Sequence, residues 1–134
     1  MSRTPRAPIA VAAAVFACAP IALAGPDCRP SRTGIELPAA LDESSGVAVG
    51  LRNPGVLWTH NDDGGHLFAI DTAGTEIAWW PVEQRLFDWE DVAAAPCDTD
   101  THCLYLADTG DNGEVRAPGT VRVVRVPEPL VEME

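Results

Sequence analysis

The chain has 134 residues, of which 46% are apolar and 22% are charged, and its formal net charge is −11. Its nine basic residues are all Arg, so it offers no strongly basic surface to neutralise nucleic-acid phosphates. The apolar content is too high for a disordered tail, and a single long apolar run argues against a polytopic membrane protein. These properties indicate one small globular unit, or a piece of a larger one.

The first 24 residues predict a secretory signal peptide. Arg3 and Arg6 provide a basic start, and an apolar run follows from Ile9 to Ala24. The run ends in Ala22-Leu23-Ala24, which has the small-x-small form that signal peptidase cleaves. A transmembrane anchor is the alternative, but a run of about 16 residues that contains Pro20 is short for a membrane span.

Export places the mature chain in the periplasm or outside the cell, where disulfides form. Lipidation at Cys18 stays open, because the preceding residues only weakly match a lipoprotein cleavage box. Cys97 and Cys103 bracket a polar turn, so we predict a disulfide that pins one hairpin. Zinc bound beside His102 is the weaker alternative, because the ligands are too few. The partner of Cys28 stays open.

After a linker with a candidate first strand over residues 25–37, short β-branched and aromatic segments alternate with clusters of Asn, Asp, Gly and Pro. No window of about 11 residues has the helical period of about 3.6 without an interrupting Gly or Pro. The pattern therefore predicts strands only. They fall in a first unit of four and a second unit of three: residues 46–50, 56–60, 66–71, 76–82, 91–95, 103–107 and 120–126.

The two units are similar in sequence. Gly46-Val47-Ala48 aligns with Asp91-Val92-Ala93, and Leu57-Trp58 aligns with Leu104-Tyr105. A period in the mid-forties with four strands per unit is typical of a β-propeller blade. A two-sheet sandwich is the alternative, because repeats also occur in sandwiches.

We therefore predict an all-β fold, an incomplete β-propeller of about two four-stranded antiparallel blades. The propeller part covers residues 38–134, with blade one at about 43–82 and a partial blade two at about 88–134. Two blades cannot close a ring, since propellers need roughly four to eight. The chain is thus expected to be the amino-terminal fragment of a longer propeller.

Loops at one end of these sheets are expected to collect negative charge. They hold eleven of the 20 acidic residues: Asp42, Glu43, Asp62, Asp63, Glu83, Asp88, Glu90, Asp91, Asp108, Asp111 and Glu114. Crowded carboxylates suit Ca²⁺, although no complete EF-hand loop is present. The candidate metal ligands are Asp62, Asp63, Glu90, Asp91, Asp108 and Asp111. The competing interpretation is that Asp, Asn and Gly in these loops only shape tight turns.

No catalytic residue can be assigned. His60 at a strand end is a candidate general base, but a lone histidine there is more often structural. Ser44 and Ser45 lack the surroundings of a serine-hydrolase nucleophile. The four tryptophans are expected to pack between blades: Trp58, Trp79, Trp80 and Trp89.

Four motifs together resemble a set of bacterial secreted six-bladed β-propeller proteins of TolB-like or phytase-like type. The motifs are Glu43-Ser44-Ser45-Gly46, Leu57-Trp58-Thr59-His60-Asn61-Asp62, Asp88-Trp89-Glu90-Asp91-Val92-Ala93 and Ala107-Asp108-Thr109-Gly110-Asp111-Asn112. The resemblance covers about residues 36 to 129, and it implies a six-bladed ring.

The phytase-like comparison implies Ca²⁺-dependent hydrolysis of phosphomonoesters. The chain departs from that pattern because it has no Lys, and only Arg85 and Arg116 lie near the expected acidic end. Two hypotheses follow. The first is a binding or scaffolding module whose acidic end recognises a cation, a carbohydrate or a protein. The second is a metal-dependent phosphoesterase or esterase, with Glu90, Asp91, Asp108 and Asp111 as first candidates for metal ligands.

Overall fold

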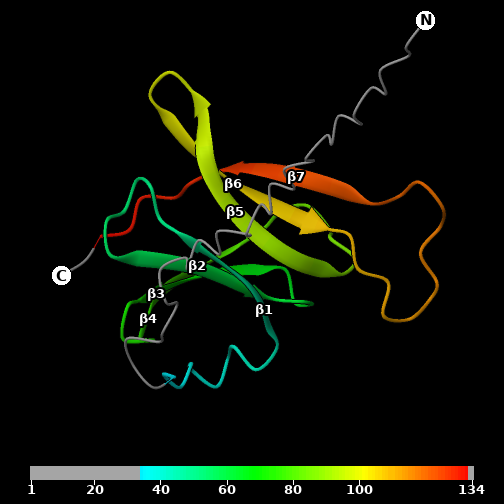
Figure 1. The fold of residues 1–134 in the computed structure, drawn as a ribbon, viewed down its shortest axis with the longest axis horizontal. Helices are drawn as coiled ribbons and strands as arrows, with labels where there is room; N and C mark the ends of the chain where they lie inside the picture. The colour runs from blue at the N-terminus through cyan, green and yellow to red at the C-terminus, as the bar shows by residue number, and fades with distance from the viewer. Residues whose placement is uncertain (1–33, 133–134) are drawn as a thin grey trace, which may run out of the picture. The chain divides into compact units, whose positions relative to one another are not determined.

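The computed structural model describes residues 34–132, and these residues form strands, turns and loops without any helix (Figure 1). The seven strands are β1 (Ser44–Val49), β2 (Val56–Asn61), β3 (His66–Asp71), β4 (Glu76–Pro81), β5 (Trp89–Asp98), β6 (Thr101–Asp108) and β7 (Arg122–Pro127). The predicted all-β class and the division into four and three strands are confirmed.

Several sequence-based expectations lie outside the described residues. These are the signal peptide, lipidation at Cys18 and the pairing of Cys28. Of the predicted linker over residues 25–37, only residues 34–37 are described, and they form no strand. In the part of the chain that the structure describes, no helix has the length and apolar character that crossing a membrane requires.

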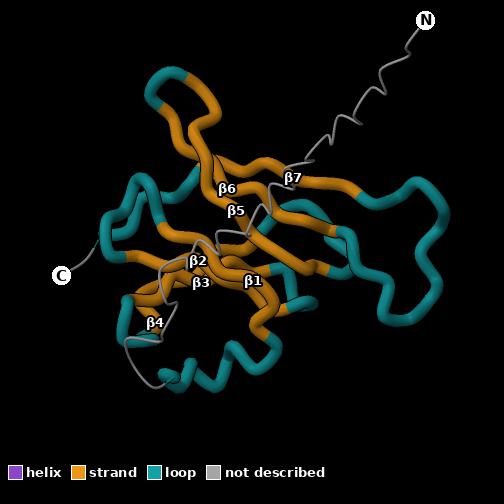
Figure 2. Tube along the Cα trace, viewed as in Figure 1, coloured by secondary structure: helices purple, strands orange, loops and turns teal. Residues whose placement is uncertain are grey.

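The strands form two antiparallel sheets, in the orders β1-β2-β3-β4 and β5-β6-β7 (Figure 2). The described residues do not close into a barrel. The strand predicted at 91–95 is present but was predicted too short: β5 runs from Trp89 to Asp98, and the chain then turns tightly at Thr99 and Asp100. Pro96 is tolerated within β5 because this strand lies at an edge of its sheet, where a missing N–H donor is harmless.

The pairing registers of the two sheets are the same. Val47 pairs with Thr59 in the first sheet, and Val92 pairs with Leu106 in the second. A register shift follows the first residue of β1 and again the first residue of β5. The repeat seen in the sequence is therefore a repeat of strand pairing, down to an irregularity at the same place.

The core lies between the two sheets. It is built from both of them: Ala48, Val56, Trp58, Leu67, Ala69, Trp89, Val92, Leu104, Leu106 and Val124. The sheets lie close together at Gly46 in β1, where a Cβ atom would come within 2.7 Å of the backbone nitrogen of Val92. Any larger residue at this position would push β1 away from β5 and open the core.

The tryptophans only partly follow the expectation that all four pack between the sheets. Trp58 and Trp89 are fully buried in the core, and Trp80 packs on Trp58 with ring centroids 5.3 Å apart. Trp79 is 54% exposed and meets His66 edge-on, so this part of the prediction was wrong. The reason is the strand alternation, which sends neighbouring residues of β4 to opposite faces.

A buried carboxylate after β7 links the second sheet to the first. The Glu128 side chain accepts hydrogen bonds from the Arg52 backbone N–H at 3.0 Å and from Trp58 Nε1 at 3.0 Å. It also accepts from the Leu51 backbone N–H at 3.2 Å and from Asn53 Nδ2 at 2.8 Å. All four donors belong to β2 or to the loop that precedes it.

Burial alone would raise the pKa of Glu128, but these four N–H donors stabilise the carboxylate and lower its pKa below the ordinary value. Glu128 is therefore held as a buried anion. Asn53 strengthens the same junction by donating to the Pro129 carbonyl at 2.8 Å and accepting from the Val131 N–H at 2.8 Å.

Replacing Glu128 by Gln is expected to lower the free energy of unfolding by about 2 kcal/mol, because an amide cannot accept from four N–H donors as a carboxylate does. Urea unfolding followed by tryptophan fluorescence measures this loss. Glu132→Gln, at an exposed position nearby, is the control and should change stability by less than about 0.5 kcal/mol. Equal losses of unfolding free energy in the two variants would contradict the role of Glu128 in joining the two sheets.

Candidate acidic cation site

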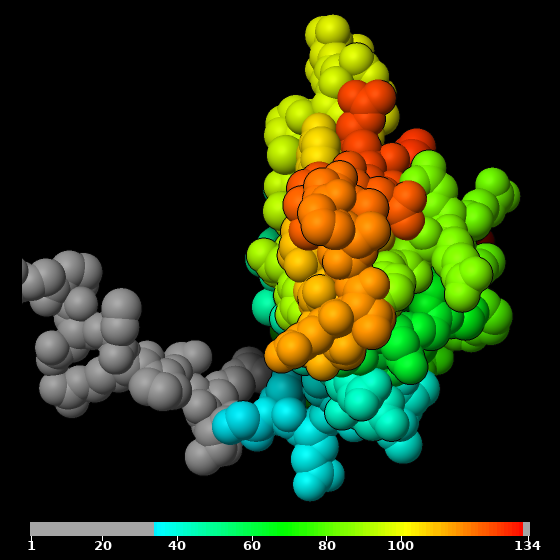
Figure 3. Space-filling view, turned by 90° about the vertical axis from the view of Figure 1, so that its right-hand side faces the viewer, coloured from blue at the N-terminus to red at the C-terminus, as the bar shows by residue number. Residues whose placement is uncertain are grey.

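The topology brings the acidic loops to one end of the two sheets. The β2–β3 loop, the β4–β5 connection and the β6–β7 loop all leave from this end, as does the segment that enters β1. The Trp89 N–H at the start of β5 donates to the Asp62 carbonyl at 3.0 Å, which holds the same ends of the two sheets together. Figure 3 shows this part of the surface, with the orange β6–β7 loop exposed beside the second sheet.

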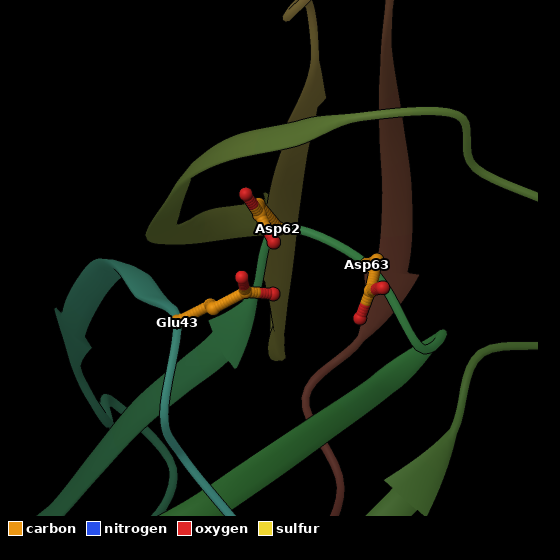
Figure 4. A group of neighbouring side chains, drawn as sticks. All are labelled: Glu43, Asp62 and Asp63. Atoms are coloured by element: carbon orange, nitrogen blue, oxygen red, sulfur yellow. The ribbon is translucent and has the colours of Figure 1, made fainter. Parts of the chain in front are cut away.

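Three carboxylates converge at this end. Glu43 from the segment before β1 points toward Asp62, and Asp63 follows in the β2–β3 loop (Figure 4). One oxygen from each of the three side chains lies within 4.8 Å of the others. Gly64 and Gly65 continue the loop with φ of 84° and 68°, a left-handed backbone that glycine adopts without strain. We call Glu43, Asp62 and Asp63 the acidic triad.

Repulsion between its carboxylates makes the triad electrostatically unfavourable. A hydrogen bond shared with Asp62 raises the pKa of Glu43 above its ordinary value of 4.5, and the charges of Asp62, Asp63 and Asp42 raise it further. In the described residues, no hydrogen bond or ion pair from a basic group or a backbone N–H reaches the carboxylates of the triad. The arrangement favours a proton or a bound cation between the carboxylates.

Asp108 has a structural role instead. It is fully buried, and its two oxygens meet Arg116 at 2.6 Å and Arg122 at 2.9 Å. The same carboxylate accepts the Phe87 and Asp88 backbone N–H groups, each at 3.0 Å. Burial opposes ionisation, but Arg116, the Asp88 N–H, Arg122 and the Phe87 N–H together lower the pKa of Asp108 to about 2.

Asp111 and Asp91 bond to nearby backbone. Asp111 accepts from the Val115 and Arg116 N–H groups, each at 2.8 Å, and so shapes the β6–β7 loop. Asp91 accepts from the Val92 N–H at 2.8 Å. For Asp111 the structure shows the local turn chemistry that the sequence left as the competing interpretation, whereas Asp91 lies within β5 at its register shift.

Asp88 and Glu90 lie beside Gly110 in the β6–β7 loop. A Cβ atom on Gly110 would come within 2.0 Å of Glu90 Oε1 and 2.6 Å of Asp88 Cγ, so a larger residue here would displace these two side chains. Asp88 also accepts the Asn112 N–H at 2.8 Å. Asp88 therefore holds the loop against the start of β5, and its carbonyl also accepts the Gly110 N–H at 3.1 Å.

Of the six predicted ligands, the structure brings together Asp62 and Asp63 and adds Glu43, which had been placed at the acidic end but not among the ligands. It does not bring Glu90, Asp91, Asp108 or Asp111 into that group. The repeat could have identified Glu43 as a site residue. Glu43 stands 45 positions before Asp88, at the same place relative to the following strand.

His60 shows the features of a structural histidine. It is fully buried, its Nδ1 lies 2.9 Å from the Asn61 carbonyl, and its ring packs on Trp89 at 5.0 Å. Its Nε2 and the Oδ1 of Asn61 are buried without a hydrogen-bond partner among the described residues.

The expected disulfide is present. Cys97 and Cys103 are bonded across the β5–β6 hairpin, with Cα atoms 5.6 Å apart. This hairpin leaves from the end of the sheets opposite the triad. The predicted disulfide is therefore confirmed as a structural link, separate from the acidic site.

Comparison with protein-family models, with curated proteins and with solved structures finds no match for this chain.

Because the pKa of Asp108 is low in the folded chain, the free energy of unfolding should depend on pH in the acid range. Because its pKa is about 2 in the folded chain and ordinarily 3.8, its contribution is complete above about pH 4 and is lost as the pH falls toward 2. Asp108→Asn is expected to lower stability at pH 7 and to flatten the decline between pH 4 and 2, as measured by urea unfolding at each pH. Asp98→Asn, exposed at the hairpin tip, is the control. If the stability of Asp108→Asn declined between pH 4 and 2 as steeply as that of the parent, the Asp108 ion pairs would be excluded as the source of the pH dependence.

Proposed function

We propose that this chain is part of an exported β-propeller that acts as a binding module, and that its acidic triad binds Ca²⁺. The convergence of the Glu43, Asp62 and Asp63 oxygens within 4.8 Å carries the proposal. Asp88, Asp108 and Asp111 at the same end are bonded to Arg side chains or to backbone N–H groups, whereas among the described residues no such donor reaches the carboxylates of the triad.

The chemistry of the donors favours calcium over other metals. All three ligands are carboxylate oxygens, which suit hard cations such as Ca²⁺ rather than zinc or copper. The triad lies in loops at or near the surface, and ligands in such positions fit the long, variable bonds of calcium better than the strict octahedron of Mg²⁺. Water and backbone carbonyls would complete the six to eight ligands that calcium takes.

The propeller part of the proposal is supported by the repeated register. Two consecutive sheets with the same strand order, the same pairing and the same irregularity pack face to face through β1 and β5. This is the relation between neighbouring propeller blades. A module of this kind presents its loops at one end, which is where the triad lies.

The phosphoesterase hypothesis receives no comparable support. Arg116 was one of two basic residues expected to hold phosphate near the acidic end. Its guanidinium instead binds Asp108 at 2.6 Å and lies over the Phe87 ring, and its side chain is only 7% exposed. A guanidinium held in this way is not free to bind a phosphate group.

Calcium is expected to bind the full chain with a dissociation constant of about 0.1–1 mM, as for exposed extracellular sites. Calcium at about ten times that constant should then stabilise the fold by about 1.4 kcal/mol. Titration calorimetry and thermal unfolding measure these effects. The variant Glu43→Gln/Asp62→Asn/Asp63→Asn should lose both.

The matched control is Asp98→Asn/Asp100→Asn/Glu132→Gln, which removes three negative charges from exposed positions away from the triad. It should bind calcium as the parent does. If the parent shows no heat of binding and no thermal shift, the cation site is excluded. If both triple variants lose binding equally, the effect belongs to net charge rather than to the triad.

Calcium affinity should also fall with acid, because a proton on Glu43 competes with the cation. The pKa of Glu43 is raised above 4.5, so the affinity should decline already at a pH above 4.5 and should level off on the alkaline side. Glu43→Gln should weaken binding and shift this decline to lower pH. Calorimetry between about pH 4 and 7 tests the prediction, and an identical pH profile in Glu43→Gln would contradict it.

A further inference from the structure

The β6–β7 loop contains an asparagine that is followed directly by a glycine, Asn112-Gly113. The loop extends past the ends of β6 and β7 (Figure 1), and both residues of the pair are exposed. Glycine has no side chain, so its backbone nitrogen is open to close approach by the amide group of the asparagine before it. Whether the pair reacts in the folded chain depends on how firmly the loop holds these atoms.

The atoms that would react are not held by hydrogen bonds. Among the described residues, neither the side-chain amide of Asn112 nor the backbone N–H of Gly113 has a hydrogen-bond partner. A Cβ atom placed on Gly113 would meet only the Cγ2 of Val115, at 3.4 Å, so the space around the pair is open. The Asn112 side chain can therefore rotate toward the Gly113 nitrogen without losing a contact of its own.

The turn around the pair is weakly closed. It runs from Asp111 to Glu114, and the Glu114 N–H donates to the Asp111 carbonyl at 2.9 Å. Glu114 has φ of 51°, a left-handed backbone that is unfavourable for a residue with a side chain. Opening of this turn breaks one exposed hydrogen bond and relieves that backbone strain, so the peptide between Asn112 and Gly113 can change its orientation.

We propose that Asn112 is a site of spontaneous deamidation in the folded chain. The backbone nitrogen of Gly113 attacks Cγ of Asn112, a C–N bond forms, and the bond from Cγ to Nδ2 breaks. The proton of the Gly113 N–H passes through water to the departing nitrogen, which leaves as ammonia. Water then opens the five-membered imide at either of its two carbonyls. The products are aspartate and isoaspartate at position 112, and water is the only co-reactant.

The other two asparagines of the chain are protected from this reaction. Asn53 precedes Pro54, whose nitrogen carries no proton, and its side chain is buried and donates to Glu128 at 2.8 Å. The Nδ2 of Asn61 donates to the Ala40 carbonyl at 2.9 Å, and its Oδ1 is buried. The fold and the sequence therefore concentrate deamidation in one loop.

Deamidation would change both the charge and the backbone of this loop. Either product adds a negative charge at the end of the sheets where Asp88 and Asp111 already lie. Isoaspartate also inserts a CH₂ group into the main chain before Gly113, which disrupts the turn that begins at Asp111. No residue of the acidic triad takes part, so the reaction is independent of calcium binding.

Trypsin separates Asn112 from the other asparagines. Cleavage after arginine gives residues 53–85, which contain Asn53 and Asn61, and residues 86–116, in which Asn112 is the only side-chain amide. The full chain is incubated for days in neutral and in mildly alkaline buffer, and its peptides are compared with a sample digested at the start. Peptide 86–116 should gain one mass unit and separate into aspartate and isoaspartate forms, and peptide 53–85 should keep its mass. The gain should be faster in alkali, because the attacking nitrogen loses its proton.

Gly113→Ala is the matched control. The φ of Gly113 lies outside the left-handed region, and a methyl group there would meet only Val115. The variant should therefore unfold in urea as the parent does. The methyl group obstructs the approach of the backbone nitrogen, so the gain in mass should be several times slower than in the parent.

Three results would overturn the proposal. The first is a parent chain whose peptide 86–116 keeps its mass while a synthetic peptide of residues 107–118 deamidates, because the fold would then protect the pair. The second is an equal rate in Gly113→Ala with aspartate as the only product, which would indicate direct hydrolysis of the amide. The third is an equal gain in mass in peptide 53–85, which would show that the loop is not a preferred site.

Discussion

The buried carboxylate of Glu128 is the contact on which the relation between the two sheets depends. Each sheet has one face in the shared core, and neither could bury that face alone. Glu128 follows the last residue of β7. Its carboxylate accepts hydrogen bonds from the loop before β2 and from the indole of Trp58, a residue of the core. An anion in this position is costly unless its donors are all in place, so Glu128 favours the packing of the sheets that brings these donors together.

A pair of equivalent side chains, one in each sheet, explains how the acidic end is organised. Asn61 and Asp108 occupy the same place in the repeat, at the end of the second strand of each sheet. Asn61 donates to the Ala40 carbonyl at 2.9 Å, and Asp108 accepts the Phe87 N–H at 3.0 Å. Both side chains therefore hold the segment that leads into the first strand of their own sheet. Asp108, unlike Asn61, is charged and also pairs with Arg116 and Arg122. These ion pairs hold the long loop before β7 in place.

The carboxylates therefore fall into two groups: some stabilise the fold, and others remain available to bind a ligand. Asp108 and Glu128 are buried, multiply bonded and have lowered pKa values, whereas Glu43 is exposed and has a raised pKa because its neighbours are also acids. Electrostatic strain that the fold does not relieve is a common feature of binding sites. The structure concentrates that strain at Glu43, Asp62 and Asp63.

Residue pattern alone determined the all-β class, the four-plus-three grouping of strands, the repeat and the Cys97–Cys103 disulfide. These features follow from alternation along a strand and from local turn chemistry, which short stretches of sequence contain. The length of β5 and the exposure of Trp79 were not predicted, because each depends on the register and facing of neighbouring strands. Asp62 and Asp63 were recognised as candidates, but sequence could not separate them from Asp108, whose partners lie 8 and 14 residues away. Only tertiary structure decided which carboxylates meet Arg or N–H donors and which meet each other. It also brought Glu128 to Trp58, 70 residues earlier in the chain, because burial and pairing between distant segments arise only when the sheets pack.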